Sequence, residues 1–281
     1  MKSLRIAAIQ LTSTAEWTEN LAMVKKWVGL AAQDGARLVV LPENVFLFSG
    51  KAMRSLADSS AQIDLLEEVR QLAVRHAIYL VVGSHPLSER PTGENVPINR
   101  VRQSCLVFSP AGELVKRYDK IHLFDVAVSD KAGAYKESTF IEPGDVDVTD
   151  IESQIIDVDG FKVGLSICYD VRFPELYRVL SHAGADVLLV PAAFTYVTGK
   201  MHWSILLAAR AIENQCFVLG VNQCGWHNKT RQTYGHSALY SPTGECLAGL
   251  EEEAGYFVYE INDLPLSDCR EKMPCLSHRR I

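Results

Sequence analysis

The sequence predicts a layered α/β protein with a mixed sheet. Short apolar runs of strand length alternate with amphipathic stretches of helical period in both halves of the chain. The hairpin turns Ser109-Pro-Ala-Gly112 and Ser241-Pro-Thr-Gly244 join neighbouring runs, which requires antiparallel pairs beside parallel ones. Because the two halves repeat this pattern, they could form two packed sheets flanked by helices.

Strands are expected where an apolar run of about four to eight residues is bounded by turn residues. The second hairpin turn leads into one further short strand, Glu245–Ala248. The other predicted strands are Leu4–Leu11, Leu38–Leu41, Tyr79–Gly83, Val101–Phe108, Leu114–Tyr118, Phe161–Ile167, Val187–Pro191, Phe217–Val221, Ser237–Tyr240 and Tyr256–Ile261.

Helices are expected where apolar residues recur three or four positions apart. In the first such segment, Leu21, Val24 and Val28 share one face. The predicted helices are Thr18–Ala32, Asp64–Val74, Glu175–Ala183 and His202–Glu213.

The organisation of the chain favours one domain. No linker rich in glycine, serine or proline separates the two halves, so a single domain is expected over residues 1–281. The longest irregular stretch is Ile121–Asp150, which is rich in Asp, Ser, Gly and Glu. A loop of that length in a compact domain is usually functional or mobile.

Composition excludes several classes of function. With 48% hydrophobic and 22% charged residues, the chain is typical of a globular protein, and no apolar stretch is long enough to span a membrane. The opening Met1–Gln10 is expected to be a strand rather than a signal peptide. A net charge of −6 without a basic block argues against a nucleic-acid partner. Seven cysteines without a C-x-x-C pair indicate neither a disulfide framework nor a zinc site, and a cytoplasmic location fits best.

Cys168 lies where a buried strand should end and a helix should begin. The run Phe161–Ile167 suits an interior strand, and Pro174 suits the first turn of a helix. A thiol at such a junction feels the partly positive helix end, which favours a reactive thiolate. The alternative is an inert core residue, because free cysteine is among the most buried residue types.

Two other charged residues could be partners of this thiol. Glu43 follows an apolar strand, at the strand end where α/β proteins gather their sites, and Lys120 comes just past another strand. Alternatively they are a solvated loop carboxylate and a surface lysine. Together with Cys168 they suit amide or nitrile hydrolysis, in which a thiolate attacks carbon, a carboxylate moves the proton and an ammonium stabilises charge on oxygen.

Three segments resemble the signature motifs of the nitrilase superfamily of carbon–nitrogen hydrolases. They are Leu41-Pro-Glu43-Asn, Tyr118-Asp-Lys120-Ile-His-Leu-Phe124 and Ser166-Ile-Cys168-Tyr-Asp-Val-Arg-Phe-Pro-Glu175, in the order and at the spacing of the family. The resemblance covers nearly the whole chain. It implies a four-layer α-β-β-α sandwich with two mixed sheets flanked by helices, a site without metal or cofactor, and assembly into a homodimer or larger homo-oligomer.

The resemblance also implies roles for individual residues. Glu43 would be the general base, Lys120 the stabiliser of the oxyanion and Cys168 the nucleophile, with the backbone N–H of Tyr169 completing the oxyanion site. Glu137 matches the second glutamate that the family often carries, and it would orient the substrate amide or support Lys120. Two glutamates near one lysine also push one carboxyl group toward its protonated form.

Arg172 and Phe194 are the expected substrate-binding residues. Arg172 has a competing structural role, shared with Asp170 and Glu175, in tying down the turn after Cys168. The histidines are expected to be structural polar groups rather than bases, and those nearest the motifs in sequence are His122, His202 and His236.

Two further segments narrow the resemblance. Asn222-Gln-Cys-Gly-Trp-His227 and Tyr234-Gly-His-Ser237 are similar to the branch that contains deaminated glutathione amidases and omega-amidases. This similarity implies hydrolysis of the amide of a small 2-oxo acid, with that amide and water as the partners. An omega-amidase, another aliphatic amidase or an N-carbamoyl hydrolase is the alternative. The alternatives that are not enzymes are a catalytically silent binding protein and a thiol redox sensor that uses Cys168.

Overall fold

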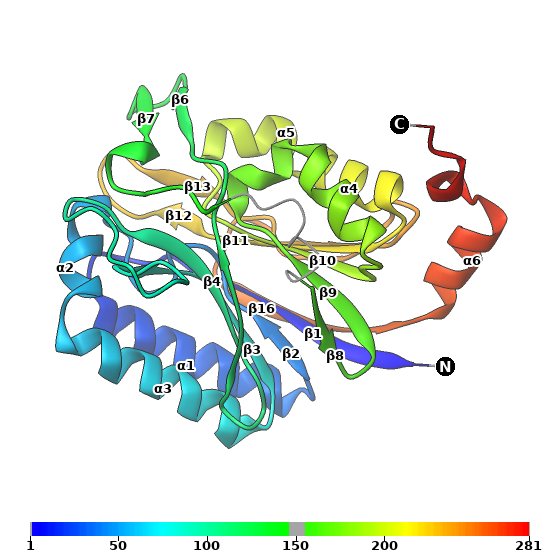
Figure 1. The fold of residues 1–281 in the computed structure, drawn as a ribbon, viewed down its shortest axis with the longest axis horizontal. Coiled ribbons are helices and arrows are strands. Elements are labelled where there is room, and N and C mark those ends of the chain that lie inside the picture. The colour runs from blue at the N-terminus through cyan, green and yellow to red at the C-terminus, as the bar shows by residue number, and fades with distance from the viewer. Residues whose placement is uncertain (1, 146–154, 281) are drawn as a thin grey trace.

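The fold is a four-layer sandwich, seen in a computed structural model that describes residues 2–145 and 155–280. Two six-stranded sheets lie face to face, with α1 (Trp17–Gln33) and α3 (Ser60–His76) outside one sheet and α4 (Pro174–His182) and α5 (Tyr196–Asn214) outside the other (Figure 1). The α-β-β-α architecture implied by the family resemblance is confirmed.

Both sheets are mixed and share one plan. In the first, β1, β2 and β3 run parallel, and the strands β16 and β4 flank them antiparallel. In the second, β9, β10 and β11 run parallel between the antiparallel strands β8 and β14. The first sheet has the order β16 (Gly255–Asn262), β1 (Ser3–Gln10), β2 (Leu38–Val40), β3 (Tyr79–Leu87), β4 (Arg102–Phe108) and β5 (Leu114–Asp119). The second has the order β15 (Cys246–Gly249), β14 (Ala238–Tyr240), β11 (Phe217–Asn222), β10 (Val187–Ala192), β9 (Phe161–Leu165) and β8 (Ile155–Val158).

The core has two parts, one on each face of the first sheet. Along β1, Leu4, Ile6 and Ala8 belong to the cluster shared with the second sheet, whereas Ala7 and Ile9 belong to the cluster under α1 and α3. Successive side chains of a strand point to opposite faces, so a strand buried on both faces must be apolar throughout. This explains why the strands are continuous apolar runs in the sequence.

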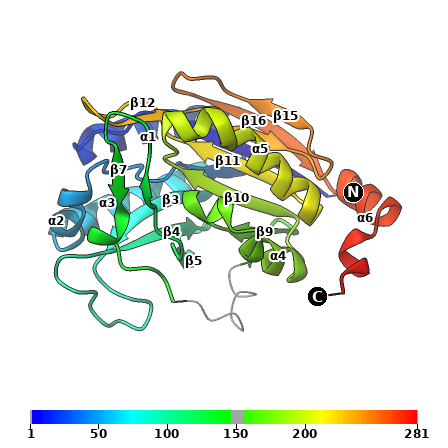
Figure 2. The ribbon, with the colours of Figure 1, turned by 90° about the horizontal axis from the view of Figure 1, so that it is seen from above.

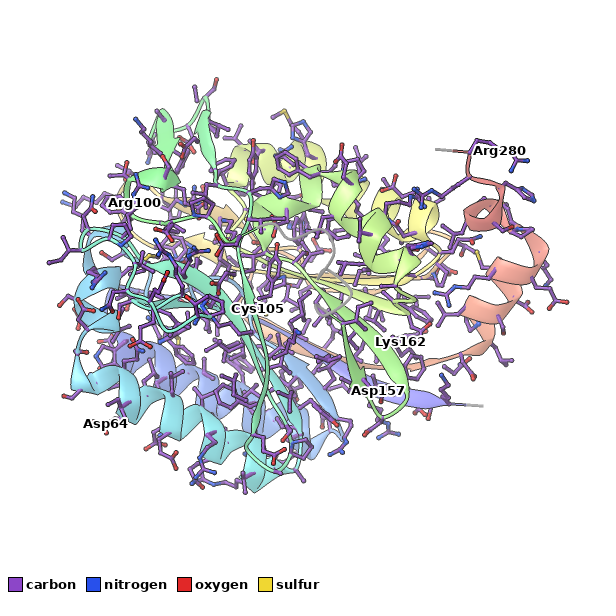
Figure 3. The ribbon with its side chains drawn as sticks, in the orientation of Figure 1. Asp64, Arg100, Cys105, Asp157, Lys162 and Arg280 are labelled. Carbon is purple, nitrogen blue, oxygen red and sulfur yellow. The ribbon has the colours of Figure 1, made fainter. Side chains whose placement is uncertain are left out.

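The cysteines predicted to pack as small apolar residues are buried. Cys105, on β4, is fully enclosed, and Cys216 and Cys224 are buried as well. Figure 3 shows Cys105 near the centre of the molecule and Asp64 at its edge. These three thiols contribute to the packing of the core and are not exposed on the surface.

The stretch predicted to be irregular, Ile121–Asp150, contains regular secondary structure. It contains a hairpin of β6 (Asp125–Ala127) and β7 (Ala134–Lys136), followed by a 3-10 turn over Glu137–Thr139. Residues 146–150 of that prediction lie outside the described residues. The strands β6 and β7 are short and polar, so neither apolar periodicity nor length marked them in the sequence.

Several short elements were also missed. They are α2 (Met53–Ala57), β8, β12 (Cys224–Trp226), β13 (Gln232–Tyr234) and α6 (Leu264–Lys272), together with 3-10 turns over Gly50–Ala52 and Cys275–His278. The helix α5 begins at Tyr196, well before the predicted start at His202, because the hydroxyl of Thr195 caps its first turn. Within the described part of the chain, no helix is long and apolar enough to cross a membrane.

Candidate active site

Three strands from both sheets place charged or reactive side chains at one end of the sandwich. Glu43 follows β2, Lys120 follows β5 and Cys168 follows β9. All three side chains are buried, and together with Glu137 they line one cavity of about 400 Å³. The structure therefore brings together the four residues that the sequence analysis expected at the site.

The ammonium group of Lys120 is held between two carboxylates. Its Nζ donates to Oε1 of Glu43 at 2.8 Å and to both carboxylate oxygens of Glu137 at 2.7 and 2.9 Å. Oε2 of Glu137 also accepts from the backbone N–H of Phe124 at 2.6 Å. A lysine has three N–H donors, so all of them are directed at carboxylate oxygens.

The second oxygen of Glu43 meets the other sheet. Oε2 accepts from the backbone N–H of Ala193, just after β10, at 2.8 Å. The next backbone N–H, that of Phe194, donates to Oδ1 of Asn222 at 2.9 Å. Both oxygens of the Glu43 carboxylate are therefore fixed in direction before any substrate arrives.

Cys168 stands on a sharp turn. Its φ is +48°, a left-handed conformation that residues other than glycine rarely adopt. Asp170 holds the turn, because its Oδ2 accepts from the backbone N–H of Ile167 at 2.8 Å and from the hydroxyl of Tyr118 at 2.7 Å. Strain at a residue that enters a cavity is typical of functional sites.

The expected junction of strand and α-helix at Cys168 is wrong in one respect. A 3-10 turn over Cys168–Arg172 separates β9 from α4, and α4 begins only at Pro174. Pro174 occupies the first turn of the helix, as predicted. The thiol therefore lies a turn away from the N-terminus of α4, and the dipole of that helix acts on it less than expected.

The surroundings of Cys168 favour the protonated thiol over the thiolate. Burial raises its pKa well above the ordinary value, the negative charge of Glu43 raises it further, and Lys120 opposes both only in part. The sequence analysis expected the helix end to favour a reactive thiolate and Glu43 to act as the general base, and the effects of burial and of Glu43 favour the thiol instead. Cys168 therefore needs a base to remove its proton at the moment of attack.

The pKa values of Lys120 and Glu137 depend on each other and on the charge of Glu43. Burial lowers the pKa of Lys120, but the charges of Glu137 and Glu43 outweigh it, and the pKa is raised well above its usual value. Burial raises the pKa of Glu137, although the ammonium of Lys120 opposes the rise. The carboxyl group of Glu137 is thus biased toward its protonated form. The sequence analysis expected this of one of the two glutamates beside the lysine.

The cavity has aromatic walls. Tyr169 and Phe194 line it, as do Phe48 from the loop after β2 and Tyr135 from β7. Arg172 is not among the lining residues, and its guanidinium lies 5.0 Å from the ring centre of Phe194 and 5.9 Å from that of Tyr169. That Arg172 contacts the substrate stays a prediction.

The expected structural role for His122 agrees with its contacts. Nδ1 of His122 lies 2.7 Å from Oδ1 of Asp170, and the ring stacks on Phe173 with the ring centres 3.6 Å apart. His202 contacts Arg172, and His236 stacks on Tyr234. None of these histidines is among the residues that line the cavity with Cys168.

The sequence analysis missed the positive charge of the cavity. Lys51, Lys136 and Arg231 also line it, so four cationic side chains face two carboxylates, both of which already bind Lys120. The lining has a formal net charge of +2 in a chain whose net charge is −6. Lys51 lies in the 3-10 turn Gly50–Ala52, Lys136 ends β7 and Arg231 precedes β13, so no single periodic pattern contains all three. The only signal was the place of Arg231 between the two segments that resembled the amidase branch.

Metal ligation has no basis in this arrangement of side chains. Across residues 2–145 and 155–280, no group of three or more His, Cys, Asp or Glu side chains is placed to hold a metal ion. The carboxylates of the cavity bind an ammonium instead.

The chain is similar to several known proteins over its whole length. A family model described as carbon-nitrogen hydrolase matches residues 5–271. A Synechocystis protein named deaminated glutathione amidase is 42% identical over 281 residues, which cover 99% of each chain. The crystal structure of the C. elegans NitFhit protein has a TM-score of 0.87 and 34% identity, over 99% of this chain and 65% of that one. A Saccharomyces cerevisiae structure, described as a member of branch 10 of the nitrilase superfamily, has a TM-score of 0.84 and 26% identity, over 100% of this chain and 97% of that one.

Proposed function

The chain belongs to the carbon-nitrogen hydrolase family, and on that premise we propose that it hydrolyses the amide of a small 2-oxo acid through a thioester on Cys168. The observation that carries this proposal is the meeting of Cys168, Glu43 and Lys120 in one buried cavity. A thiol, a carboxylate and an ammonium can supply the nucleophile, the general base and the oxyanion stabiliser of amide cleavage by a covalent route.

In the first half of the reaction, the carboxylate of Glu43 takes the thiol proton while the sulfur of Cys168 attacks the amide carbon. A C–S bond forms, and the carbonyl electron pair moves to oxygen. When this pair returns, the C–N bond breaks, and the leaving nitrogen takes the proton from Glu43. The raised pKa of the Cys168 thiol supports this route, because attack must be coupled to removal of the proton.

In the second half, water replaces the amine. Glu43 takes a proton from water, the resulting hydroxide attacks the thioester carbon, and the C–S bond breaks to release the acid. The proton then returns to the sulfur of Cys168. Because Ala193 and Lys120 fix both oxygens of Glu43, the same carboxylate is in place for both proton transfers.

Lys120 stabilises the negative charge that develops on oxygen, together with the backbone N–H of Tyr169. All three donors of Lys120 are directed at carboxylates, and two of them at the same group, Glu137. Redirecting one of those two to the oxyanion leaves Lys120 still bound to both glutamates. Glu137 therefore supports Lys120 and, when protonated, can itself donate to the substrate.

The acidic character of the substrate rests on the charge of the cavity. A lining with a net charge of +2 attracts an amide that carries a carboxylate, and low-dielectric walls strengthen that attraction. A relative of 42% identity over the full chain is named deaminated glutathione amidase, and deaminated glutathione is such an amide. We therefore place this activity first. An omega-amidase, an aliphatic amidase and an N-carbamoyl hydrolase are alternatives within the same chemistry.

A role as redox sensor has weaker support. Redox sensors depend on thiolates of low pKa that solvent can reach, whereas burial raises the pKa of Cys168. A silent binding protein needs no base beside its thiol. The geometry of Glu43 and Cys168 therefore supports hydrolysis over both.

The proposal extends to the state of the chain. We propose one domain over residues 1–281, located in the cytoplasm and assembled as a homodimer or larger homo-oligomer, with no nucleic-acid or membrane partner. All seven cysteines are free, which suits a reducing compartment. The outer face of α5 leaves Met201, Ile205 and Ile212 more than half exposed, at 52%, 70% and 52%, which suits association through that helix.

Substrate profiling tests the activity. The purified enzyme and its Cys168→Ala variant are given deaminated glutathione, 2-oxoglutaramate, a neutral amide, an N-carbamoyl amino acid and a nitrile, and release of amine or ammonia is measured. We expect turnover of the 2-oxo acid amides by the intact enzyme alone, with a transient acyl adduct on Cys168 in the mass spectrum. Equal release by both proteins would contradict the proposal.

A further inference from the structure

Arg231 is linked to the catalytic carboxylate through a single residue. Its Nη2 donates to the carbonyl oxygen of Ala193 at 2.7 Å, and the N–H of Ala193 donates to Glu43 at 2.8 Å. The backbone N–H of Arg231 is itself held by Oδ1 of Asn228 at 2.9 Å, in the turn between β12 and β13. The guanidinium is therefore anchored close to the reacting groups.

Aromatic side chains from two other elements fix its plane. The guanidinium carbon lies 4.5 Å from the ring centre of Tyr135, on β7, and 5.8 Å from that of Phe48, in the loop after β2. Phe48 in turn stacks on His227, with the ring centres 3.6 Å apart. Figures 1 and 2 both place the β6–β7 hairpin beside β12. Arg231 is thus held in one orientation before substrate binds.

The charge of Arg231 has no carboxylate partner within the described residues. Arg90, Arg102 and Arg270 all form ion pairs, whereas no described Asp or Glu lies within ion-pair distance of Arg231. Its Nη1 is buried and has no hydrogen-bond acceptor in that part of the chain. A buried, fixed donor without an acceptor is unfavourable unless something that enters the cavity supplies one.

We propose that Arg231 binds the carboxylate of the substrate and so selects acidic amides over neutral ones. This inference rests on the amidase function proposed above and identifies the residue that would recognise the acid. The planar guanidinium offers a carboxylate two parallel donors, a geometry that a lysine cannot reproduce. Lys51 and Lys136 also line the cavity, but neither shows an anchor comparable to the bond from Arg231 to Ala193.

Because Arg231 and Glu43 both bond to Ala193, Arg231 also affects where the substrate lies relative to Glu43. A carboxylate drawn to Arg231 is placed at a fixed distance from Glu43, because both side chains bond to one peptide segment. An acid amide of the right length then presents its carbonyl carbon to Cys168. The selection thus acts on charge and on the separation of carboxylate and amide.

The test compares a matched pair of substrates. Values of kcat/KM are measured for 2-oxoglutaramate and for neutral pentanamide, a five-carbon amide that lacks the carboxylate and the 2-oxo group, with the intact enzyme, Arg231→Gln and Arg231→Lys. For Arg231→Gln we expect about a 10- to 100-fold loss for 2-oxoglutaramate and about a threefold change or less for pentanamide. Arg231→Lys should recover part of the loss, because it restores the charge without the fork. Arg75→Gln, on the exposed face of α3, is the control for loss of a positive charge.

Binding is measured separately from chemistry. Titration calorimetry with 2-oxoglutaramate compares Cys168→Ala with the Cys168→Ala, Arg231→Gln double variant, and thermal unfolding checks that each is folded. We expect the second substitution to weaken binding by a similar factor. An equal loss on both substrates would overturn the inference and assign Arg231 a structural role. Preference of the intact enzyme for pentanamide would instead overturn the proposed substrate class, whatever Arg231 does.

Discussion

At the scale of single residues, the site depends on the ammonium group of Lys120, which binds two carboxylates. Lys120 is bonded to Glu43 and Glu137, and Cys168 lies close enough for both the lysine and Glu43 to affect its pKa. The carboxylate of Glu43 raises the thiol pKa, so the base that activates the sulfur also keeps it protonated at rest. The thiolate therefore forms only when Glu43 takes the proton during the reaction. Because oxidants attack the thiolate, a sulfur that stays protonated between turnovers is protected from oxidation.

The protonated state of Cys168 has a measurable consequence. Below the pKa of a thiol, the thiolate fraction and hence the alkylation rate rise about tenfold for each pH unit. Burial first, and then Glu43, raise the pKa of Cys168 well above its ordinary value. We therefore expect the rate of alkylation by iodoacetamide, followed by mass spectrometry of the peptide that contains Cys168, to keep rising between pH 7 and pH 9.

In the same samples, alkylation of the peptides that contain the exposed cysteines, Cys246 and Cys275, gives the reference profile. A plateau of the Cys168 rate near pH 7 would show a stable thiolate, and the reaction would then need no base for its first step. Glu43→Gln removes the nearby negative charge, so it should shift the whole profile toward lower pH.

At the scale of elements, the strands of the parallel core were predictable and the loops that complete the site were not. The runs before Glu43 and Cys168 are apolar because their strands are buried on both faces, so pattern alone located them. The walls that carry Tyr135 and Arg231 are short polar hairpins. Their place depends on contacts far apart in sequence, such as Lys131 lying 4.4 Å from the ring centre of Trp226, and periodicity carries no information on those.

The packing of α5 on the second sheet depends on a missing side chain. A Cβ on Gly220, in β11, would overlap the side chain of Leu207 and come within 2.7 Å of Trp203, both buried on α5. We therefore expect Gly220→Ala to lower the free energy of unfolding by about 1 to 3 kcal/mol, as overpacked cores do. Urea denaturation followed by fluorescence gives this value, and the midpoint should fall with little change in slope.

Gly249→Ala is the matched control. This glycine also lies in a strand of the second sheet, β15, but its added Cβ would meet no atom closer than 3.5 Å. The control should stay within about 0.5 kcal/mol of the parent, which is usual for substitutions at open surface positions. If both variants lost the same stability, the loss would come from replacing a strand glycine in general and not from contact of the added Cβ with α5.

At the scale of the whole molecule, the site is built where two similar halves meet. The path β1, α1, β2, α3, β3 in the first half has the same sheet order as β9, α4, β10, α5, β11 in the second. The runs that end β2 and β10 both lead through a proline, Pro42 and Pro191, to the residues that face each other across the sandwich. The first run carries the carboxylate of Glu43, and the second supplies the N–H of Ala193 that receives it. Repetition was visible in the sequence, but which copies of the repeat would touch was not, because that depends on how the two sheets pack.

The stability of the whole fold should fall in mild acid because two buried histidines resist protonation. Burial lowers the pKa of His85 to about 3, and neither ring nitrogen has a hydrogen-bond partner among the described residues. Burial also lowers the pKa of His227 to about 4. Unfolding restores an ordinary value near 6.5, so between pH 6.5 and 4 the unfolded chain binds more protons than the folded one. The stability is fully present above pH 6.5 and is lost as the pH falls.

Within that window each histidine contributes a slope of up to about 1.4 kcal/mol per pH unit to the free energy of unfolding. Replacing His85 by leucine removes one titrating group from an apolar site, so the slope should become shallower by about that amount, whatever the substitution does to stability at pH 7. Urea unfolding at pH 7, 6, 5 and 4.5 measures both slopes. If the slope of the His85→Leu variant equalled that of the parent, His85 would take up its proton in the folded chain as readily as in the unfolded one. Water would then have to reach the buried ring and bind its nitrogen atoms.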